Sequence, residues 1–147
     1  MLLCLFNKTG LTQADLSMSE LEEKAFEHFT AESWEEAHRS YAELLSLDGT
    51  NANFQMRYAA TLLHDSRLRA EGVQRLAALA ESDKLRGEGL YWWGRACLFD
   101  GNPERAEAVL KDALEDADKR AFWKADCALA LAQSKEMPIR FDVAKDS

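Results

Sequence analysis

The feature that most constrains the fold is a small residue that recurs at a nearly constant interval along the chain. The first such series is Ala25, Ala59, Gly94 and Ala128, with spacings of 34, 35 and 34 residues. Two further series share this period: Ala37, Gly72 and Ala106, and the larger residues Tyr41, Leu76 and Leu110. A period of this length is typical of a stacked repeat protein. We therefore expect an extended binding surface rather than an enclosed catalytic pocket.

The composition favours helix. The 147 residues include only 7 Gly and 2 Pro, and 47% of them are hydrophobic while 30% are charged. Apolar residues recur in steps of three and four, and no alternating strand pattern competes with them. The chain is thus predicted to be all-α, folded and long enough to bury a sizeable core.

The charge balance excludes one class of partner. The net charge is −8, from 26 acidic and 18 basic side chains, whereas duplex nucleic acid requires a basic face. The acidic residues crowd the first repeat and follow the last one, and the middle of the chain is more basic. These charges indicate solvated helix faces, or else the steering of a partner with a basic segment.

The cysteines and the chain start bear on localisation. Cys4, Cys97 and Cys127 are odd in number and widely spaced, so they predict neither a disulfide framework nor a zinc site. The apolar run at 1–6 is too short for a signal sequence, and no run is long enough to span a membrane. A cytoplasmic location is expected.

Capping and turn residues divide the chain into a lead-in at 1–17, a repeat domain at 18–135 and a tail at 136–147. Ser19 and Glu22 form a capping-box pattern, so a first helix is expected to begin near residue 19. Ser33 is expected to cap the second helix, and Gly49 to close it in a left-handed conformation. The repeats are expected at 18–51, 52–86 and 87–120, followed by a capping helix at 119–135 that docks through Ala128 and Leu131.

The paired helices resemble the tetratricopeptide repeat, a helix–turn–helix unit of 34 residues. The third repeat is most similar, with Leu90, Trp93, Gly94 and Cys97 at first-helix signature positions. The second helices follow the pattern through the Ala37 and Tyr41 series described above. The resemblance implies a right-handed superhelix of about three such repeats plus a C-terminal capping helix, whose concave face holds a peptide. Physically, Ala or Gly is needed wherever two antiparallel helices cross closely.

Within this family, one group grips a C-terminal carboxylate with Lys and Asn side chains. The corresponding positions here hold Glu22, Phe26, Arg57, Glu88 and Trp92. Two lysine positions have become acidic, so a carboxylate would be repelled there and that clamp is rejected. Size, charge and groove character instead resemble the class II chaperones of type III secretion, which hold an apolar segment of a secreted protein.

Apolar and aromatic side chains on the first helix of each repeat are the candidate partner-binding residues. They are Phe26, Phe29, Met56, Arg57, Leu63, Tyr91, Trp92, Arg95 and Phe99. Phe29 and Leu63 could equally pack between repeats. Trp92 is the strongest candidate, because adjacent helix residues point about 100° apart and Trp93 takes the core position.

The sequence therefore predicts a protein-interaction module, either an adaptor or a chaperone, that binds an apolar or helical segment of a partner. Basic residues in that segment would suit the acidic faces. One alternative is a structural homodimer or assembly subunit that uses the N-terminal segment and the apolar patch. Another is a ligand-responsive regulator or enzyme with a pocket near His64 and Arg95. No catalytic motif, cofactor-binding loop or metal-ligand spacing occurs, so the protein is not expected to be an enzyme.

Overall fold

The computed structural model describes residues 13–116, 128–133 and 135, with side chains from residue 17 onward. Six helices follow one another in the first of these ranges: α1 (Gln13–Thr30), α2 (Trp34–Leu47), α3 (Ala52–Leu62), α4 (Arg69–Glu81), α5 (Glu88–Phe99) and α6 (Pro103–Asp116). Residues 128–133 are also helical, and the described part of the chain contains no strand. The all-α prediction is confirmed.

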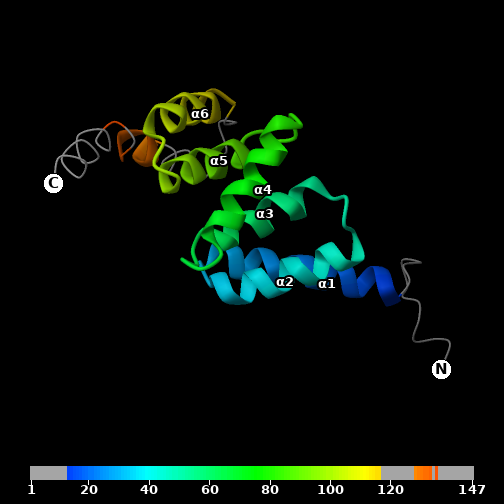
Figure 1. Ribbon diagram of the computed structural model, residues 1–147. Helices are drawn as coiled ribbons and strands as arrows, with labels where there is room; N and C mark the ends of the chain where they lie inside the picture. The colour runs from blue at the N-terminus through cyan, green and yellow to red at the C-terminus, as the bar shows by residue number, and fades with distance from the viewer. Residues whose placement is uncertain (1–12, 117–127, 134, 136–147) are drawn as a thin grey trace.

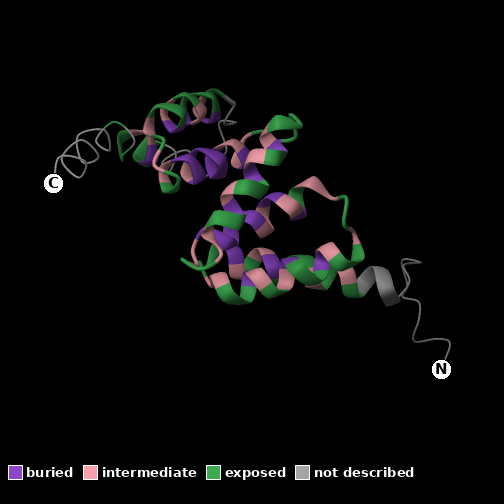
Figure 2. Cartoon of the chain, viewed as in Figure 1, coloured by how far each residue is buried: buried purple, intermediate pink, exposed green. Residues whose placement is uncertain are grey.

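The helices pair into three hairpins that stack in chain order (Figure 1). Within each hairpin the two helices pack along each other, and α2 then packs on α3 and α4 on α5. Helix α3 also contacts α5 directly. Buried residues lie along these shared seams, and the outer faces are exposed (Figure 2). This is the architecture of a helical repeat superhelix.

The small-residue series lies where the helices cross. Ala25, Ala37, Ala59 and Ala106 are completely buried, as are Tyr41, Leu76 and Leu110. At the two glycines the fit is closest. A Cβ added to Gly72 would come 2.9 Å from the carbonyl oxygen of Ala59, and one added to Gly94 would come 2.5 Å from the Leu110 side chain. Both positions require glycine because the neighbouring helix occupies the space of a methyl group.

Helix boundaries differ from prediction at two places. Helix α1 begins at Gln13, so the expected start near Ser19 is wrong. No glycine or proline stops the helix between these positions, and Ser19 lies inside it as an exposed residue. Gly49 does not adopt a left-handed conformation; the glycines that do are Gly87 and Gly101.

Three helices end in the same left-handed turn. The second residue after the helix end is Glu32 at φ 61° for α1, Asp83 at 55° for α4 and Gly101 at 76° for α5. In each case the next backbone N–H donates to a carbonyl five residues earlier, at 2.9–3.0 Å. Two of these turns use a non-glycine residue, which is why the sequence did not disclose them.

The C-terminal helix docks in a different register from the one predicted. Ala128 is exposed, and Ala130 is the residue buried in the core, at 1% exposure. Leu131 packs against that core as expected. Most of the lead-in, residues 119–127 of the predicted capping helix and the tail at 136–147 lie outside the described residues, as do Cys4 and Cys127.

Candidate functional site

An aromatic cluster joins the first hairpin to the third. Phe29 near the end of α1, Trp34 at the start of α2 and Trp92 in α5 meet edge to face, with ring centroids 5.3–5.9 Å apart. Tyr91 packs on Trp92 at 4.9 Å. Edge-to-face pairs at such distances stabilise beyond the area they bury, by about 0.5–1.5 kcal/mol each. The cluster therefore holds α5 against helices that are far from it in the chain.

His64, just after α3, completes the cluster. Its ring stacks on Trp34 with centroids 3.7 Å apart and planes 10° apart. In the neutral ring, Nδ1–H donates to the carbonyl oxygen of Ala60 at 3.0 Å. Burial, opposed by that hydrogen bond and assisted by the charges of Arg95 and Arg69, lowers the pKa of His64 to about 4. At neutral pH the imidazole is uncharged and behaves as another flat apolar surface.

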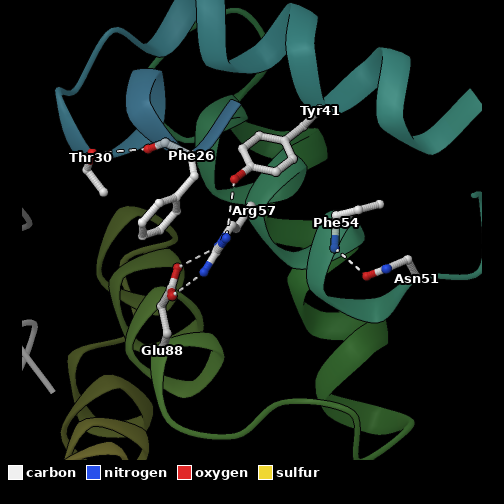
Figure 3. Close-up of polar contacts among 7 residues, drawn as sticks. All are labelled: Phe26, Thr30, Tyr41, Asn51, Phe54, Arg57 and Glu88. Atoms are coloured by element: carbon white, nitrogen blue, oxygen red, sulfur yellow. Dashed lines mark hydrogen bonds and ion pairs between the residues drawn. The ribbon is translucent and has the colours of Figure 1, made fainter. Parts of the chain in front are cut away.

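A largely buried ion pair joins α3 to α5 (Figure 3). Arg57 in α3 donates to both carboxylate oxygens of Glu88 in α5, at 3.1 and 3.3 Å, and to the hydroxyl of Tyr41 in α2 at 3.4 Å. Its guanidinium also lies 4.6 Å from the centre of the Phe26 ring in α1. Burial would lower the pKa of Arg57, but the hydrogen bond and charge of Glu88 outweigh it and raise the pKa.

Beside the cluster lies a hollow of about 230 Å³, which we call the aromatic hollow. Its walls come from α1, the start of α2, the end of α3, α5 and the C-terminal helical stretch. The lining residues are Phe29, Thr30, Glu32, Trp34, His64, Glu88, Tyr91, Trp92, Arg95, Leu129, Ala130 and Gln133. The hollow is thus built from elements at both ends of the chain.

At one edge of the aromatic hollow two arginines converge on an exposed ring. Arg95 lines the hollow and lies 5.9 Å from the centre of the Phe99 ring, and Arg69 at the start of α4 lies 4.4 Å from the same ring. Phe99 is 38% exposed. This edge is therefore cationic and apolar at once.

The nine side chains predicted to bind a partner divide into three groups. Five are buried: Phe29, Met56, Leu63, Tyr91 and Trp92. Three are partly buried: Phe26, Arg57 and Arg95. Phe99 alone among the nine is exposed. The structure brings four of them together at the aromatic hollow, namely Phe29, Tyr91, Trp92 and Arg95.

The expectation that Trp92 stands clear of the core is wrong, and its neighbour Tyr91 is buried as well. Trp92 and Trp93 do point in different directions, but both directions are occupied. Trp92 faces the aromatic cluster, and Trp93 lies on another side of α5, where the guanidinium of Arg105 stacks 5.2 Å from its ring. Both indoles are more than nine-tenths buried. Trp92 forms a wall of the hollow instead of projecting from a surface.

Sequence reasoning missed Trp34 and Leu129 as lining residues. Trp34 is an apolar residue at the first position of α2, next to a turn, where an indole can fold back over the end of the preceding helix. This position in the sequence could have identified Trp34 as a candidate lining residue. Leu129 carries no such signal, because its position depends on how the C-terminal stretch docks.

Neither a metal-ligating cluster nor an activated thiol is found among the described residues. Within the described ranges, no group of three His, Cys, Asp or Glu side chains is placed to hold a metal ion. Burial raises the pKa of the Cys97 thiol to about 11, so it stays protonated at neutral pH and is a poor nucleophile. None of the described helices combines the length and apolar character that crossing a membrane requires.

No protein-family model matches the chain, and no curated protein matches it in sequence. Its fold, however, is similar to that of SycD, a type III secretion translocator chaperone of Yersinia enterocolitica. The two structures superpose with a TM-score of 0.63 over 87% of this chain and 88% of SycD, at 16% sequence identity. At this identity the likeness concerns the fold, which is the helical repeat superhelix that the sequence predicts.

Proposed function

We propose that the protein binds an apolar segment of a partner protein in the aromatic hollow and so acts as a chaperone or adaptor for that partner. The observation that carries this proposal is an open hollow with aromatic walls and an exposed apolar rim. Leu129 at the rim is 60% exposed. An exposed large apolar side chain next to aromatic walls is typical of a binding site for an apolar side chain of a partner protein.

The size of the aromatic hollow favours a side chain over a small-molecule ligand. Its volume of about 230 Å³ falls below the roughly 300–1,000 Å³ of typical small-molecule sites. One or two anchor side chains of a peptide would fill it. The fold is similar to that of SycD, a translocator chaperone, which is in keeping with a role of this kind.

The walls are rigid, which favours tight binding of a flexible segment. Phe29, Trp34 and Trp92 hold one another in place, and Glu88 is fixed by Arg57. A preformed site spends little of its interaction energy on ordering its own side chains. The partner segment supplies most of the ordering cost, which is the usual arrangement when a helical repeat protein binds an extended peptide.

A matched pair of leucines tests the proposal. Leu129 and Leu47 are equally exposed, at 60% and 61%, but only Leu129 lines the aromatic hollow. Peptides selected from a displayed random library on the wild-type protein serve as probes. We expect Leu129→Ala to weaken their binding about tenfold, because an apolar contact of roughly 1.4 kcal/mol is lost. Leu47→Ala should leave the dissociation constant unchanged.

Fluorescence anisotropy with labelled peptides gives the two dissociation constants. Both substitutions are at exposed positions, so unfolding free energies should agree within about 0.5 kcal/mol and exclude a folding defect. Equal binding by both variants would place the peptide elsewhere. Failure to select any peptide above an unrelated control protein would remove the proposal itself. The alternative of a homodimer formed through the N-terminal segment rests largely on residues 1–12, which lie outside the described chain.

A further inference from the structure

Two guanidinium groups from different hairpins meet at the edge of the aromatic hollow. Arg69 is the first residue of α4, and Arg95 and Phe99 lie one turn apart on α5. Both guanidinium groups stack on the exposed ring of Phe99, at 4.4 and 5.9 Å. In a chain of net charge −8, two positive charges against one exposed ring beside a hollow require a physical explanation.

Neither of these arginines bonds to a carboxylate within the described residues. Arg69 donates from Nε to the carbonyl oxygen of Leu63 at 2.8 Å, and Arg95 donates from Nη1 to the hydroxyl of Tyr91 at 2.9 Å. Five other described arginines do form ion pairs with Asp or Glu: Arg39, Arg57, Arg67, Arg75 and Arg86. A guanidinium carries five N–H donors, so these single bonds leave most donors of the pair available.

No described acidic group that lines or adjoins the hollow forms an ion pair with either arginine. Glu88, which lines the hollow, is held by Arg57, and Asp65 in the turn after α3 is held by Arg67. Glu32 in the turn after α1 also lines the hollow, and neither arginine bonds to it. His64 adds no positive charge of its own, since its pKa of about 4 keeps it neutral at pH 7. The positive potential at this edge therefore comes from Arg69 and Arg95. Both side chains are partly buried, where a charge is screened less by solvent than on an open surface.

On the basis of the proposed function, we propose that Arg69 and Arg95 bind a carboxylate side chain of the partner, an Asp or Glu that lies close in sequence to the apolar anchor in the aromatic hollow. Planar guanidinium groups bind carboxylates through paired hydrogen bonds, which adds direction as well as charge. Because Arg95 both lines the hollow and contacts Phe99, the two binding features adjoin.

This site differs from the carboxylate clamp that the sequence rejects. The clamp positions include Glu22 and Glu88, whereas the arginine pair uses the start of α4 and the last turns of α5. It also predicts an acidic residue where the overall charge of the chain alone would favour a basic one. Charge at the recognition edge, rather than net charge, should therefore decide which apolar segments bind.

The test compares each selected peptide with its amide isostere, in which Asp or Glu becomes Asn or Gln. The selected peptides should carry an acidic residue within about four positions of an aromatic or aliphatic anchor, a reach of roughly 13 Å for extended chain. On the wild-type protein we expect the amide form to bind about tenfold more weakly at low salt. The difference should shrink at high salt.

Variants of the protein then show which residues cause the difference in binding between acid and amide peptides. In the double variant Arg69→Gln, Arg95→Gln, acid and amide peptides should bind equally within about twofold. Arg75→Gln, which breaks an ion pair with Glu71 on another surface, should retain the full tenfold difference. The wild-type comparison does not depend on any variant folding.

The outcomes separate the two proposals. Apolar peptides that bind through Leu129 but show no difference between acid and amide would overturn the arginine-pair proposal and leave the proposed function standing. A preference for basic peptides would overturn it too. If no peptide is selected, both proposals fail. A dimer in sedimentation that dissociates on loss of Arg69 and Arg95 would assign the pair to self-association and overturn the proposal.

Discussion

At the scale of single residues, the closest fit among the described glycines is at Gly94. A methyl group there would approach the side chain of Leu110 to 2.5 Å, and Leu110 is completely buried. Overpacking of this kind costs about 1–3 kcal/mol. It outweighs the roughly 1 kcal/mol that alanine would gain over glycine as a helix former. Overpacking should therefore outweigh helix propensity, so that Gly94→Ala destabilises the protein.

We predict that Gly94→Ala lowers the free energy of unfolding by about 1–2 kcal/mol, measured by urea denaturation. Gly49→Ala is the control. Gly49 is exposed, has no left-handed conformation and would meet only the Leu45 carbonyl oxygen, at 3.3 Å. It should change stability by less than about 0.5 kcal/mol. A stabilised Gly94→Ala protein would show that α5 and α6 are not in close contact.

His64 predicts a dependence of stability on pH. The unfolded chain binds a proton as the pH falls through about 6.5, but the folded protein does so only near pH 4. Stability due to this neutral imidazole is therefore complete above pH 6.5, falls as the pH drops towards 4 and levels off below. The loss is at most about 3 kcal/mol, and solvent contact of the partly buried ring reduces it.

The measurement is urea unfolding of the wild type and of His64→Gln between pH 7 and pH 5. Across that interval the wild type should lose more stability than the variant. Carboxylate titration is common to both proteins and cancels in the comparison. Parallel curves would mean that His64 is solvated and is not stacked on Trp34.

At the scale of helices, caps explain where the second hairpin begins. Asn51 precedes α3, and its side-chain oxygen accepts from the backbone N–H of Phe54 at 3.0 Å (Figure 3). Ser33 precedes α2 in the same position but makes no side-chain cap bond. The two N-cap residues therefore differ in how much they stabilise their helices, although both are residue types that are favoured at this position.

Substitution by alanine should separate these two caps. Asn51→Ala is expected to cost about 1 kcal/mol of unfolding free energy, because an N–H of α3 loses its acceptor. Ser33→Ala should cost less than about 0.5 kcal/mol. Thermal and urea unfolding of both variants would measure this. A larger loss at Ser33 would contradict the cap assignments.

The helices were largely predictable and the site was not, for a physical reason. The Ala25 and Ala37 series mark crossings within one hairpin, where the need for a small residue is local and repeats with the period. Trp92 is buried by Phe29 and Trp34, which belong to a hairpin that is not its neighbour in the chain. Periodicity within a repeat carries no information about such a contact.

The docking of the C-terminal stretch shows the same limit. Extending the period to Ala128 gave the wrong buried residue, since Ala130 is the one that enters the core. Within the described residues no further hairpin packs on this stretch, so the crossing rule that fixes the inner helices does not constrain it. Its position nevertheless matters, because it supplies one wall of the aromatic hollow.

At the scale of the whole molecule, stacking three hairpins brings residues from both ends of the chain around one hollow. The ion pair between Arg57 and Glu88 and the aromatic contacts of Trp92 lock neighbouring and distant hairpins together. A repeat protein whose first and third units touch should resist bending more than one that is joined only by neighbours. Such rigidity would keep the hollow preformed for the apolar segment that the proposed function requires.

The most direct test follows the indole N–H signals of the tryptophans by NMR while a selected apolar peptide is added. Trp34 and Trp92 line the aromatic hollow, whereas Trp93 lies on another side of α5 and serves as an internal control. We predict that the signals of Trp34 and Trp92 shift with peptide concentration and that the signal of Trp93 does not. Shifts at Trp93 with unchanged signals at Trp34 and Trp92 would contradict this prediction.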